Sequence, residues 1–530
     1  MAEKKEGGMK MKNKKATKLL SAFIALFLVF ALTGCGGSEE SAAENEGSTI
    51  VIALPRDIST LDPANHRLRE AENVIRNIFD GLITKTYDGK IVPEIAESWE
   101  AVSDTEWEFK IREGVTFHNG DPLTADDVVF TFERIIKEGT MEGQTSPRKG
   151  LMGSTSDVYK VDDYTVRFVN EEPNPVFLHG VVHQQIIPKN YFKEVGIDGF
   201  LEHPIGAGPF KFVSGRLNDQ IVLERYDDYY GGSPAIPPVG PASLKRVIFK
   251  VMPETSTAIA ALKNNEVNII SNIPPDMIAN LVADPNVNVK EVQGTRTYML
   301  EMNTKMPPFD NVKVRQAMNY AINTDEILET IYDGRGERLS GAIMPHSFGV
   351  HPDLKPYEYN LEKAKELLEE AGVTDLQVVI DTESKRENVA LAMAAMLQKI
   401  GIDAQVRNWE WGILQSEIQN GTRQMYLTDW GDSWLDPVGI INPKFRTDDR
   451  GNFSHYSNSR VDELLTAAEM TVDMEQRETC YHEVEEILYE EAPIVFGYIL
   501  MEVEASTANV ENWQPSMDGR QNMHRVRITN

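Results

Sequence analysis

The sequence predicts an α/β protein built from two or three domains. The chain has 530 residues, which is longer than a single hydrophobic core usually supports. Its apolar content of 41% and charged content of 25% are typical of a globular protein. In the second half, three helical patterns each stop at a glycine and lead into a strand pattern. Helices that alternate with strands in this way are typical of a helical layer packed on a largely parallel sheet.

The first 34 residues are expected to be a targeting segment outside the fold. A lysine-rich patch precedes an apolar run at 19–32, which is too short to span a bilayer comfortably but fits a secretory signal. The tetrapeptide at Leu32–Cys35 resembles a bacterial lipobox, which predicts a signal peptide at 1–34 and lipidation of Cys35. Residues 35–48 then form a flexible acidic tether. A plain signal peptide or a short membrane anchor is the alternative.

The folded region is expected to open with a short strand at 49–55, which is rich in valine and isoleucine. A second strand is expected further on, where Trp107, Phe109 and Ile111 alternate with charged residues. This alternation is typical of a strand with one buried face.

A helix is expected to begin after Thr124, because Asp127 three residues later completes a capping pattern. The apolar residues at 128–136 recur with helical spacing. The segment at 164–170 predicts a further strand, and the Gly/Pro-rich stretch at 228–242 predicts a surface connection.

The second half carries the clearest alternation of helix and strand. Ligands of parallel sheets gather beyond the carboxyl ends of the strands. The segment 428–437, "TDWGDSWLDP", begins where the third strand is expected to end, so we expect it to lie at a ligand site. The expected helices lie at 361–372, 387–401 and 413–421, and the expected strands at 376–381, 402–409 and 424–430.

Charge and motifs argue against an enzyme, a cofactor site or a nucleic-acid-binding protein. The net charge of −29 disfavours binding to nucleic acid or to anionic lipid. The chain has no phosphate-binding loop, no dinucleotide glycine fingerprint and no serine nucleophile motif.

With two cysteines, neither a disulfide framework nor a thiolate zinc site is expected, and Cys480 is expected to be a buried, inert thiol. His179 and His183 have the spacing of a helical metal pair but lack a third ligand, so packing or surface roles are expected. We therefore expect no catalytic residue, no metal and no cofactor.

Seven segments, taken together and in order, resemble the family 5 solute-binding proteins of ABC importers, the dipeptide-, oligopeptide- and nickel-binding group. The resemblance covers about residues 49–500 and is most specific at 107–134 and 303–323. The segments are "STLDPAN", "NIFDGLI", "AESWE", "WEFKIREGVTFHNGDPLTADDVVFTFERI", "IGAGPFKFV", "MNTKMPPFDNVKVRQAMNYAIN" and "YSNSRVDELL".

The resemblance implies a bilobed, periplasmic-binding-protein-like α/β fold of type II with three domains and the ligand in the cleft between the lobes. A ligand would favour closure of such lobes only to the extent that it contacts both of them. The implied core of lobe 1 comprises 49–88, 204–300 and 500–530, with an inserted domain at 89–203 and lobe 2 at 301–499.

Site residues follow from the resemblance by local match. In peptide-binding relatives, the turn after "LDP" and an aromatic residue of the 428–437 loop contact the ligand, and the matching residues include Arg67 and Trp430. The arginines could instead pair with Glu70 and Glu72, and the tryptophans could instead pack in the core. The ligand-binding candidates are Arg67, Leu68, Arg69, Tyr298, Trp409, Trp411, Trp430, Asp432, Ser433, Trp434 and Tyr498.

One position departs from the pattern of the peptide-binding relatives. Their loop places an aspartate three residues after the tryptophan, where it pairs with the peptide α-ammonium, but this chain has Ser433 there. Asp432 lies one residue earlier, and neighbouring side chains of an extended segment face opposite ways. Either the loop shifts so that Asp432 binds the amine, or no free amine is recognised. Arg67 and Arg69 favour an acidic group on the ligand.

The resemblance implies a lipid-anchored, extracytoplasmic binding component of an ABC importer that delivers peptides to a membrane permease and its ATPase. It is expected to be a monomer and not an enzyme, with no nucleic acid as partner. The alternatives are a non-peptide solute, such as a nickel complex, an oligosaccharide or an amino-acid conjugate, or a solute sensor without a transport role. Clustered tryptophans suit sugar stacking as well as peptide side chains.

Overall fold

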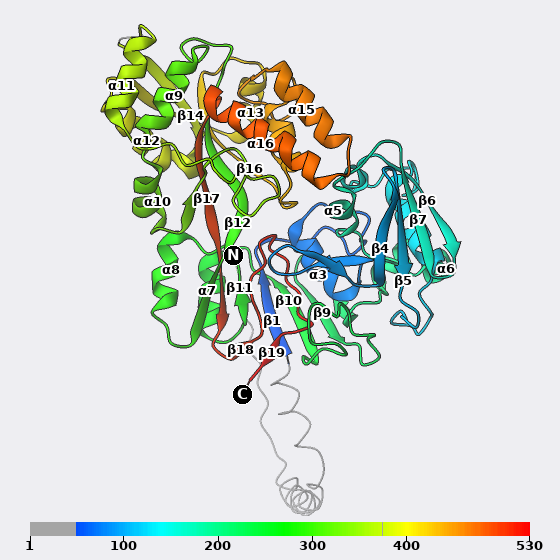
Figure 1. Cartoon of the computed structure of the whole chain (residues 1–530). Helices are drawn as coiled ribbons and strands as arrows, with labels where there is room; N and C mark the ends of the chain where they lie inside the picture. Colours follow the sequence, from blue (N-terminus) through cyan, green and yellow to red (C-terminus); the bar gives the residue numbers. More distant parts are fainter. Residues whose placement is uncertain (1–48, 374, 530) are drawn as a thin grey trace, which may run out of the picture. The chain divides into compact units, whose positions relative to one another are not determined.

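The computed structural model of the chain describes residues 49–373 and 375–529 (Figure 1). The predicted signal peptide, the lipidation site Cys35 and the tether at 35–48 lie outside the described residues. Among the described residues, no helix combines the length and the apolar character needed to cross a membrane.

An 11-stranded sheet connects the first, middle and last parts of the chain. Its longest strands, β12 and β17, pair antiparallel side by side (Figure 1). The N-terminal strand β1, which was predicted at 49–55, pairs parallel with β10. The strand order is β15 (Asp403–Trp409), β14 (Gln377–Glu383), β16 (Met425–Gly431), β12 (Val287–Met302), β17 (Ile494–Thr507), β11 (Ile269–Ile270), β1 (Thr49–Leu54), β10 (Arg246–Val251), β9 (Gln220–Arg225) and β8 (Phe210–Gly215), with β13 (Gly336–Arg338) paired to β17.

The predicted parallel layer is confirmed at one end of this sheet. Strand β14 pairs parallel with both β15 and β16, so the carboxyl ends of the three strands lie at one edge. The helices α11 (Leu361–Glu370), α12 (Glu387–Gln398) and α13 (Trp411–Gln419) each end just before a glycine with positive φ. Strand β16 continues to Gly431, so the first four residues of 428–437 belong to the strand rather than to the loop.

A second, four-stranded antiparallel sheet has the order β4 (Ala96–Ser103), β5 (Glu106–Ile111), β7 (Thr165–Asn170), β6 (Thr155–Asp162). Strand β5 contains the predicted alternation, with Phe109 fully buried. Helix α4 (Ala125–Ile136) begins with the predicted capping box, in which the Thr124 N–H donates to Asp127 Oδ2 at 3.0 Å. Its Phe132 ring packs against Phe168 of β7 with centroids 4.6 Å apart.

The remaining elements cover these sheets or connect them. Buried apolar residues form several separate clusters, one around α9, α12 and β14, another around α3, β1 and β10, and a third under the four-stranded sheet. The domain boundaries given above stay a prediction. These elements are α3 (Arg69–Ile78), β2 (Ile83–Lys85), β3 (Ile91–Pro93), α5 (Phe177–Val181), α6 (Lys189–Glu202), α7 (Thr255–Lys263), α8 (Pro275–Val282), α9 (Val312–Ala321), α10 (Thr324–Tyr332), α14 (Ile441–Phe445), α15 (Ser459–Glu469), α16 (Met474–Glu491), β18 (Val510–Glu511) and β19 (Arg527–Ile528), with the short 3₁₀ helices η1 (Lys149–Met152), η2 (Ser384–Arg386) and η3 (Pro437–Gly439).

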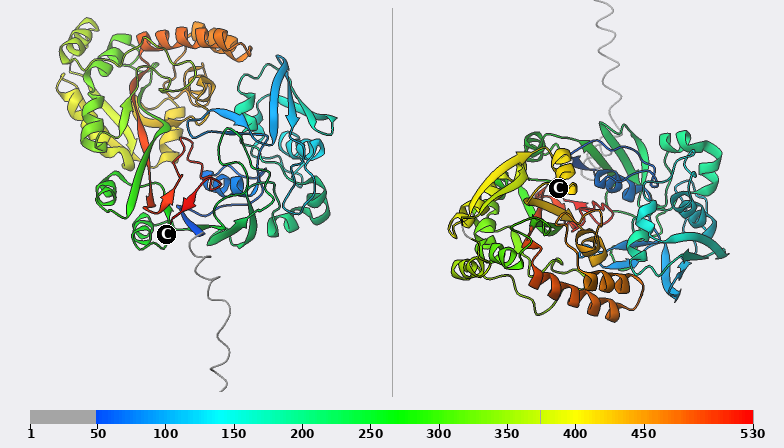
Figure 2. Two further views of the ribbon diagram at one scale, coloured as in Figure 1. Left: turned by 60° about the horizontal axis from the view of Figure 1, so that its bottom comes forward. Right: turned by 90° about the horizontal axis from the view of Figure 1, so that it is seen from above.

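Two irregular segments pack closely on the region around α3. The stretch 228–242 is irregular as predicted, but it is not only a surface connection, because the Tyr229 and Tyr230 hydroxyls both donate to the buried Asp80 carboxylate at 2.7 Å. The C-terminal segment returns beside α3 (Figure 2), where Asn77 Nδ2 donates to the Gln521 carbonyl at 2.8 Å.

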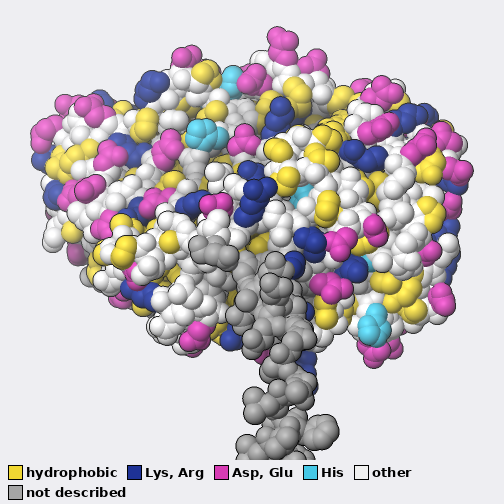
Figure 3. Space-filling view, turned by 90° about the horizontal axis from the view of Figure 1, so that it is seen from below, with side chains coloured by type: hydrophobic (Ala, Val, Ile, Leu, Met, Phe, Trp, Pro, Cys, Tyr) yellow, Lys and Arg dark blue, Asp and Glu magenta, His cyan; other side chains and the backbone are white. Residues whose placement is uncertain are grey.

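The net negative charge is not gathered on the face shown in Figure 3, where acidic and basic side chains are interspersed. No large patch of one sign marks this face as a partner surface.

Candidate functional site

Two neighbouring cavities are lined by five of the predicted site residues: Arg67, Leu68, Arg69, Trp411 and Trp430. The first, here the aromatic cavity, has a volume of about 480 Å³ and is lined at the carboxyl ends of β14 and β16 and by the start of α13. The second, here the arginine cavity, has a volume of about 340 Å³ and is lined by the end of β1, the start of α3 and residues of β17. Arg296 of β12 lines both cavities, so the two adjoin each other and are described together as one candidate site.

The aromatic wall of the site comes from Trp411, Trp430 and Phe453. Trp430 is held in place because its Nε1 donates to the Gly439 carbonyl at 2.8 Å and its ring meets Phe453 edge-on, with centroids 6.5 Å apart. Fixed aromatic faces of this kind bind apolar side chains or flat rings at little cost in conformational entropy.

The other two tryptophan candidates lie outside both cavities. Trp409 Nε1 donates to Asp381 Oδ1 at 2.6 Å, and its ring lies between the guanidinium groups of Arg407 and Arg423. Trp434 lies beside His179, with ring centroids 6.4 Å apart. The structure therefore gives both tryptophans local packing partners in place of a position in the cavity wall.

Arg67, Leu68 and Arg69 all line the arginine cavity. Neither Glu70 nor Glu72 pairs with these arginines, because Glu70 lies against Arg56 and Glu72 against Arg76. Arg69 reaches Glu502 at 4.0 Å.

Arg67 and Arg450 are two site cations without a carboxylate partner among the described residues. Burial lowers the pKa of Arg67, and the positive charge of Arg450 lowers it further. The Arg450 guanidinium carbon lies 5.2 Å from the centroid of the Trp430 ring. Two neighbouring cations that lack carboxylates are suited to an acidic group of a ligand.

Many polar residues of the site were missed by sequence reasoning, among them Arg296, Glu383, Arg386, Asp429 and Arg450. The Asp429 carboxylate is held between Arg296 and Arg386, and Arg386 also donates to Glu383 Oε2 at 2.5 Å. Arg386 and Glu383 could have been found from the sequence, because they lie at the carboxyl end of β14. Ligands of a parallel sheet gather beyond the carboxyl ends of its strands, and this holds for β14 as it does for β16. Arg450 carries no comparable local signal.

Asp432 and Ser433 do not line either cavity. Asp432 is 3% exposed; its N–H donates to the Thr295 carbonyl at 2.8 Å, and its Oδ1 accepts the Trp434 N–H at 2.9 Å. Its Oδ2 has no hydrogen-bond partner among the described residues, and burial raises its pKa to about 7. The Ser433 carbonyl accepts from Lys85 Nζ at 3.1 Å.

The tyrosine candidates pack against each other at the junction of β12 and β17. The rings of Tyr298 and Tyr498 stack with centroids 5.2 Å apart, and Tyr498 is 1% exposed. The Tyr498 hydroxyl lies 3.3 Å from that of Tyr332. Neither Tyr298 nor Tyr498 lines a cavity, so in this arrangement they support the strands that carry the site.

The site is more basic than the rest of the chain. Seven basic and five acidic residues line the two cavities together, whereas the whole chain has a net charge of −29. Burial also raises the pKa of Glu504 to about 7, so this carboxyl group contributes less negative charge to the site at neutral pH. The basic residues are Arg56, Arg67, Arg69, Arg296, Lys385, Arg386 and Arg450, and the acidic residues are Glu70, Glu383, Asp429, Glu502 and Glu504.

His183 and Cys480 are both packed inside the fold. His183 Nδ1 lies 2.9 Å from Glu72 Oε1, and in the described part of the chain no group of three or more His, Cys, Asp or Glu side chains is placed to hold a metal ion. Cys480 is buried, and burial raises its thiol pKa, as expected for an inert thiol.

Comparisons with known proteins bear on the family and the fold of the chain. The family model described as "Bacterial extracellular solute-binding proteins, family 5 Middle" matches residues 90–452. The chain is 30% identical over 436 residues to a dipeptide-binding protein of Escherichia coli, covering 76% of this chain and 80% of that protein. It is 29% identical over 433 residues to heme-binding protein A of Haemophilus influenzae, covering 76% and 78%. The solved structure of HbpA2 from Haemophilus parasuis matches with a TM-score of 0.83 at 26% identity, covering 91% of this chain and 100% of that one. The predicted fold class, periplasmic-binding-protein-like of type II, is confirmed.

Proposed function

Because the chain belongs to the bacterial extracellular solute-binding proteins of family 5, we propose that it captures peptides in the joined cavities and delivers them to an ABC importer. The chain is a solute-binding protein and not an enzyme. The observation that carries the peptide proposal is the pairing of a fixed aromatic wall with two cations that lack carboxylates. A peptide offers the matching groups, an apolar side chain and a carboxylate.

The acidic group of the ligand is the main polar anchor in this proposal. A carboxylate between Arg67 and Arg450 would accept charge-assisted hydrogen bonds from both guanidinium groups. It would also neutralise two positive charges that now repel each other. The apolar part of the ligand would then lie against Trp430 and Trp411.

The amine of a peptide has no free carboxylate partner on the wall of the aromatic cavity. Asp429 and Glu383 line the aromatic cavity, but both are engaged by Arg386. Asp432 is buried behind the wall, so binding of an α-ammonium by Asp432 would require the 432–436 loop to move. We therefore expect the carboxylate to contribute more to affinity than the amine.

Capture couples to lobe closure because the two anchoring cations come from different parts of the chain. Arg67 belongs to the predicted lobe 1, and Arg450 to the predicted lobe 2. A ligand carboxylate that bridges them favours the closed arrangement by its differential affinity for that state. The closed form, tethered to the membrane through lipidated Cys35, would present the peptide to the permease.

The test is recovery of the natural ligand. Ligands released by denaturing the purified protein are identified by mass spectrometry, and candidates are then titrated in thermal melts. We expect peptides with a free carboxyl terminus, which at 100 times the dissociation constant should stabilise the fold by about 2.7 kcal/mol. Recovery of no peptide, together with no shift from a di- to pentapeptide library, would contradict the proposal.

A second candidate ligand is a flat aromatic compound that bears carboxylates. Similarity to a protein named for heme binding favours it, since Trp430, Phe453 and the site arginines would serve such a ligand equally well. An absorbance band above 350 nm in the purified protein, or a melt that responds to a porphyrin but not to peptides, would select this ligand over a peptide.

A further inference from the structure

A buried carboxyl group, Glu504 of β17, lies on the wall of the arginine cavity. It is 5% exposed, and no lysine, arginine or histidine of the described residues lies within ion-pair distance of it. Its side-chain hydrogen bond comes from Gln521, whose Nε2 donates to Glu504 Oε2 at 2.8 Å. A buried carboxylate without a cation is costly, so this wall is suited to a positive charge brought by a ligand.

A second carboxyl group, Glu502, lies beside Glu504. The two residues are two positions apart on β17, so their side chains leave the same face of the strand, and both line the cavity. Arg69 of α3 lies 4.0 Å from Glu502 but is not within ion-pair distance of Glu504. This end of the cavity therefore lacks one positive charge, whereas the end at Arg67 and Arg450 lacks negative charge.

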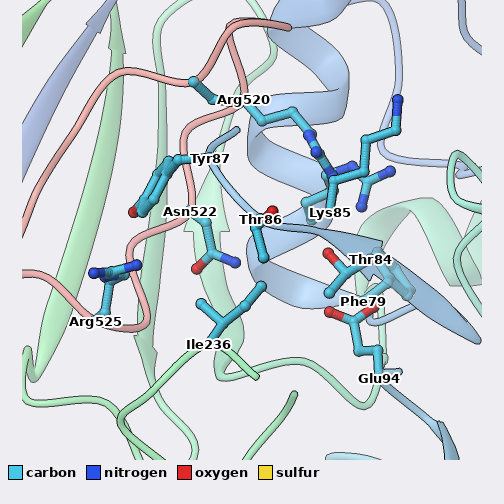
Figure 4. Close-up of a pocket in the computed structure, with 12 residues that line it drawn as sticks. Phe79, Thr84, Lys85, Thr86, Tyr87, Glu94, Ile236, Arg520, Asn522 and Arg525 are labelled. Carbon is cyan, nitrogen blue, oxygen red and sulfur yellow. The ribbon is translucent and has the colours of Figure 1, made fainter. Parts of the chain in front are cut away.

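The C-terminal segment fixes the orientation of Glu504. Gln521 lines the arginine cavity, whereas its neighbours Arg520 and Asn522 line a separate cavity of about 30 Å³ (Figure 4). Gln521 is held in turn by α3, because its backbone N–H donates to Asn73 Oδ1 at 3.2 Å. Oε2 of Glu504 is thus committed to Gln521, and the structure gives Oε1 no hydrogen-bond partner among the described residues.

Two further titratable groups face Glu504 from neighbouring elements. Lys290 of β12 lies opposite Glu504 in the sheet, but its Nζ donates to the Trp513 carbonyl. Tyr87, which lines the separate cavity, interacts electrostatically with Glu504 (Figure 4). Neither group supplies the missing positive charge.

Glu504 therefore holds a proton more readily than an exposed glutamate does. Burial is the largest cause of the rise of its pKa to about 7. The hydrogen bond from Gln521 lowers this pKa, the charge of Glu502 raises it, and the charge of Arg69 lowers it.

The cavity wall at Glu504 also lies where parallel strands end. Strand β1 pairs parallel with β11, and Leu54 at the end of β1 and Ser271 just after β11 both line the arginine cavity. Ligands gather beyond the carboxyl ends of parallel strands. The position of Glu504 in the fold thus favours a ligand contact independently of its charge.

We propose that Glu504, together with Glu502, binds an ammonium group of the solute inside the arginine cavity. For a peptide this group is the α-ammonium, and the peptide carboxylate lies at Arg67 and Arg450. The inference rests on the proposed function, because it takes the two cavities as the place of the ligand. It gives the amine the partner that the buried Asp432 does not provide.

Binding of an ammonium group to Glu504 should release a proton. The cation favours the ionised carboxylate, so the pKa of Glu504 falls when the ligand binds. At pH 6 the carboxyl group of the free protein is mostly protonated, and the release should approach about one proton per ligand. The ligand itself takes up no proton at this pH, since an α-ammonium has a pKa of about 7.7–8.0. A protonated Glu504 that donated a hydrogen bond to a ligand carboxylate would release none.

The first experiment measures this release by calorimetry at pH 6 in buffers of different ionisation enthalpy. The probes are the tightest-binding peptide of a di- to pentapeptide library and its N-acetylated form. Glu504→Gln should abolish the release and weaken the free peptide by about 10-fold, with little effect on the acetylated peptide. Glu511→Gln, at an exposed glutamate, and Asp432→Asn, at the other buried carboxyl near the site, should keep the release.

The second experiment tests the ammonium contact without a peptide. Thermal melts at pH 6 compare glycinamide, which carries an ammonium group and no carboxylate, with the uncharged N-acetylglycinamide. Glycinamide alone should stabilise the wild type, and neither compound should stabilise Glu504→Gln.

The outcomes separate this inference from the proposed function. Peptides that bind without proton release, or with a release that survives Glu504→Gln, would overturn the ammonium contact and leave peptide capture standing. A library that does not bind would contradict peptide capture, and the glycinamide melts would then decide the contact by themselves. Equal responses of the wild type and Glu504→Gln to glycinamide would overturn it.

Discussion

At the scale of single residues, the ligand chemistry that we propose depends on Arg67 and Arg450. Both lie at the joined cavities, and neither has a carboxylate partner in the described residues. Arg69, although adjacent to Arg67, has Glu502 within 4.0 Å. The two unpaired guanidinium groups are therefore the places where an acidic ligand gains most.

Arg67→Ala and Arg450→Ala should each raise the dissociation constant of a peptide with a free carboxyl terminus by about 10- to 100-fold, the usual effect of losing a charge-assisted hydrogen bond. Isothermal titration calorimetry measures this, with the exposed Arg216→Ala as the control. A C-terminally amidated peptide should bind the wild type weakly and lose little more in either variant. Equal affinity of all four proteins for the free peptide would remove the acidic-anchor role.

Asp432 predicts a pH dependence of stability. Burial raises its pKa to about 7, above the value in the unfolded chain, so the folded protein holds a proton that the unfolded chain has released. The stability contributed by the protonated group is complete below about pH 4 and is lost as the pH rises through about 7. Asp432→Asn mimics the protonated form. Its free energy of unfolding should therefore rise relative to that of the wild type by about 1 kcal/mol for each pH unit of increase in this window.

Urea unfolding of the wild type and of Asp432→Asn at pH 5, 6 and 7 measures the difference. Parallel stability profiles of the two proteins would show that Asp432 titrates normally in the fold. Asp57→Asn, at an exposed aspartate, serves as the control for the substitution itself.

At the scale of elements, the glycines that end α11, α12 and α13 stop each helix and send the chain into the next strand. Gly421 after α13 has φ +66°, a left-handed conformation that any residue with a Cβ atom adopts only at a cost. A Cβ at this position would meet only ordinary contacts, so the cost of a substitution would come from the backbone.

Gly421→Ala should therefore lower the free energy of unfolding by about 1–2 kcal/mol. Gly412→Ala, within the same helix α13, keeps a right-handed backbone. Its Cβ would lie 3.2 Å from Oε2 of the exposed Glu410 side chain, which can shift, so the change should be close to neutral. Denaturant unfolding of the pair distinguishes backbone strain from the added methyl group, and equal effects of the two changes would rule strain out.

Local patterns predicted these elements well because periodicity and caps act within a few residues. The α4 capping box, the alternation of β5 and the helix–strand order from 361 to 431 all appear in the structure. The long pairing of β12 with β17 carries no local signal, since the paired residues lie about 200 positions apart. The burial of Asp432 was missed for the same reason, because Thr295 of β12 provides its backbone acceptor.

At the scale of the whole molecule, location depends on a segment outside the described residues. If Cys35 is lipidated, Cys35→Ala should release the protein from the membrane fraction into the soluble extracytoplasmic fraction. Immunoblots of separated fractions, with loss of labelling by a radioactive fatty acid, measure this. A variant that stays in the membrane fraction would favour the alternative of a short membrane anchor.

The sequence by itself determined the solute-binding family, the α/β fold class and the aromatic wall at Trp430, because each depends on local motifs in order along the chain. Only the tertiary structure decided which charges line the two cavities. It brought Arg296 and Arg450 to the site, moved Asp432 behind the wall and paired Asp429 with two arginines. The physical reason is that the environment of a charge is set by partners distant in sequence, whose positions follow from packing and strand pairing.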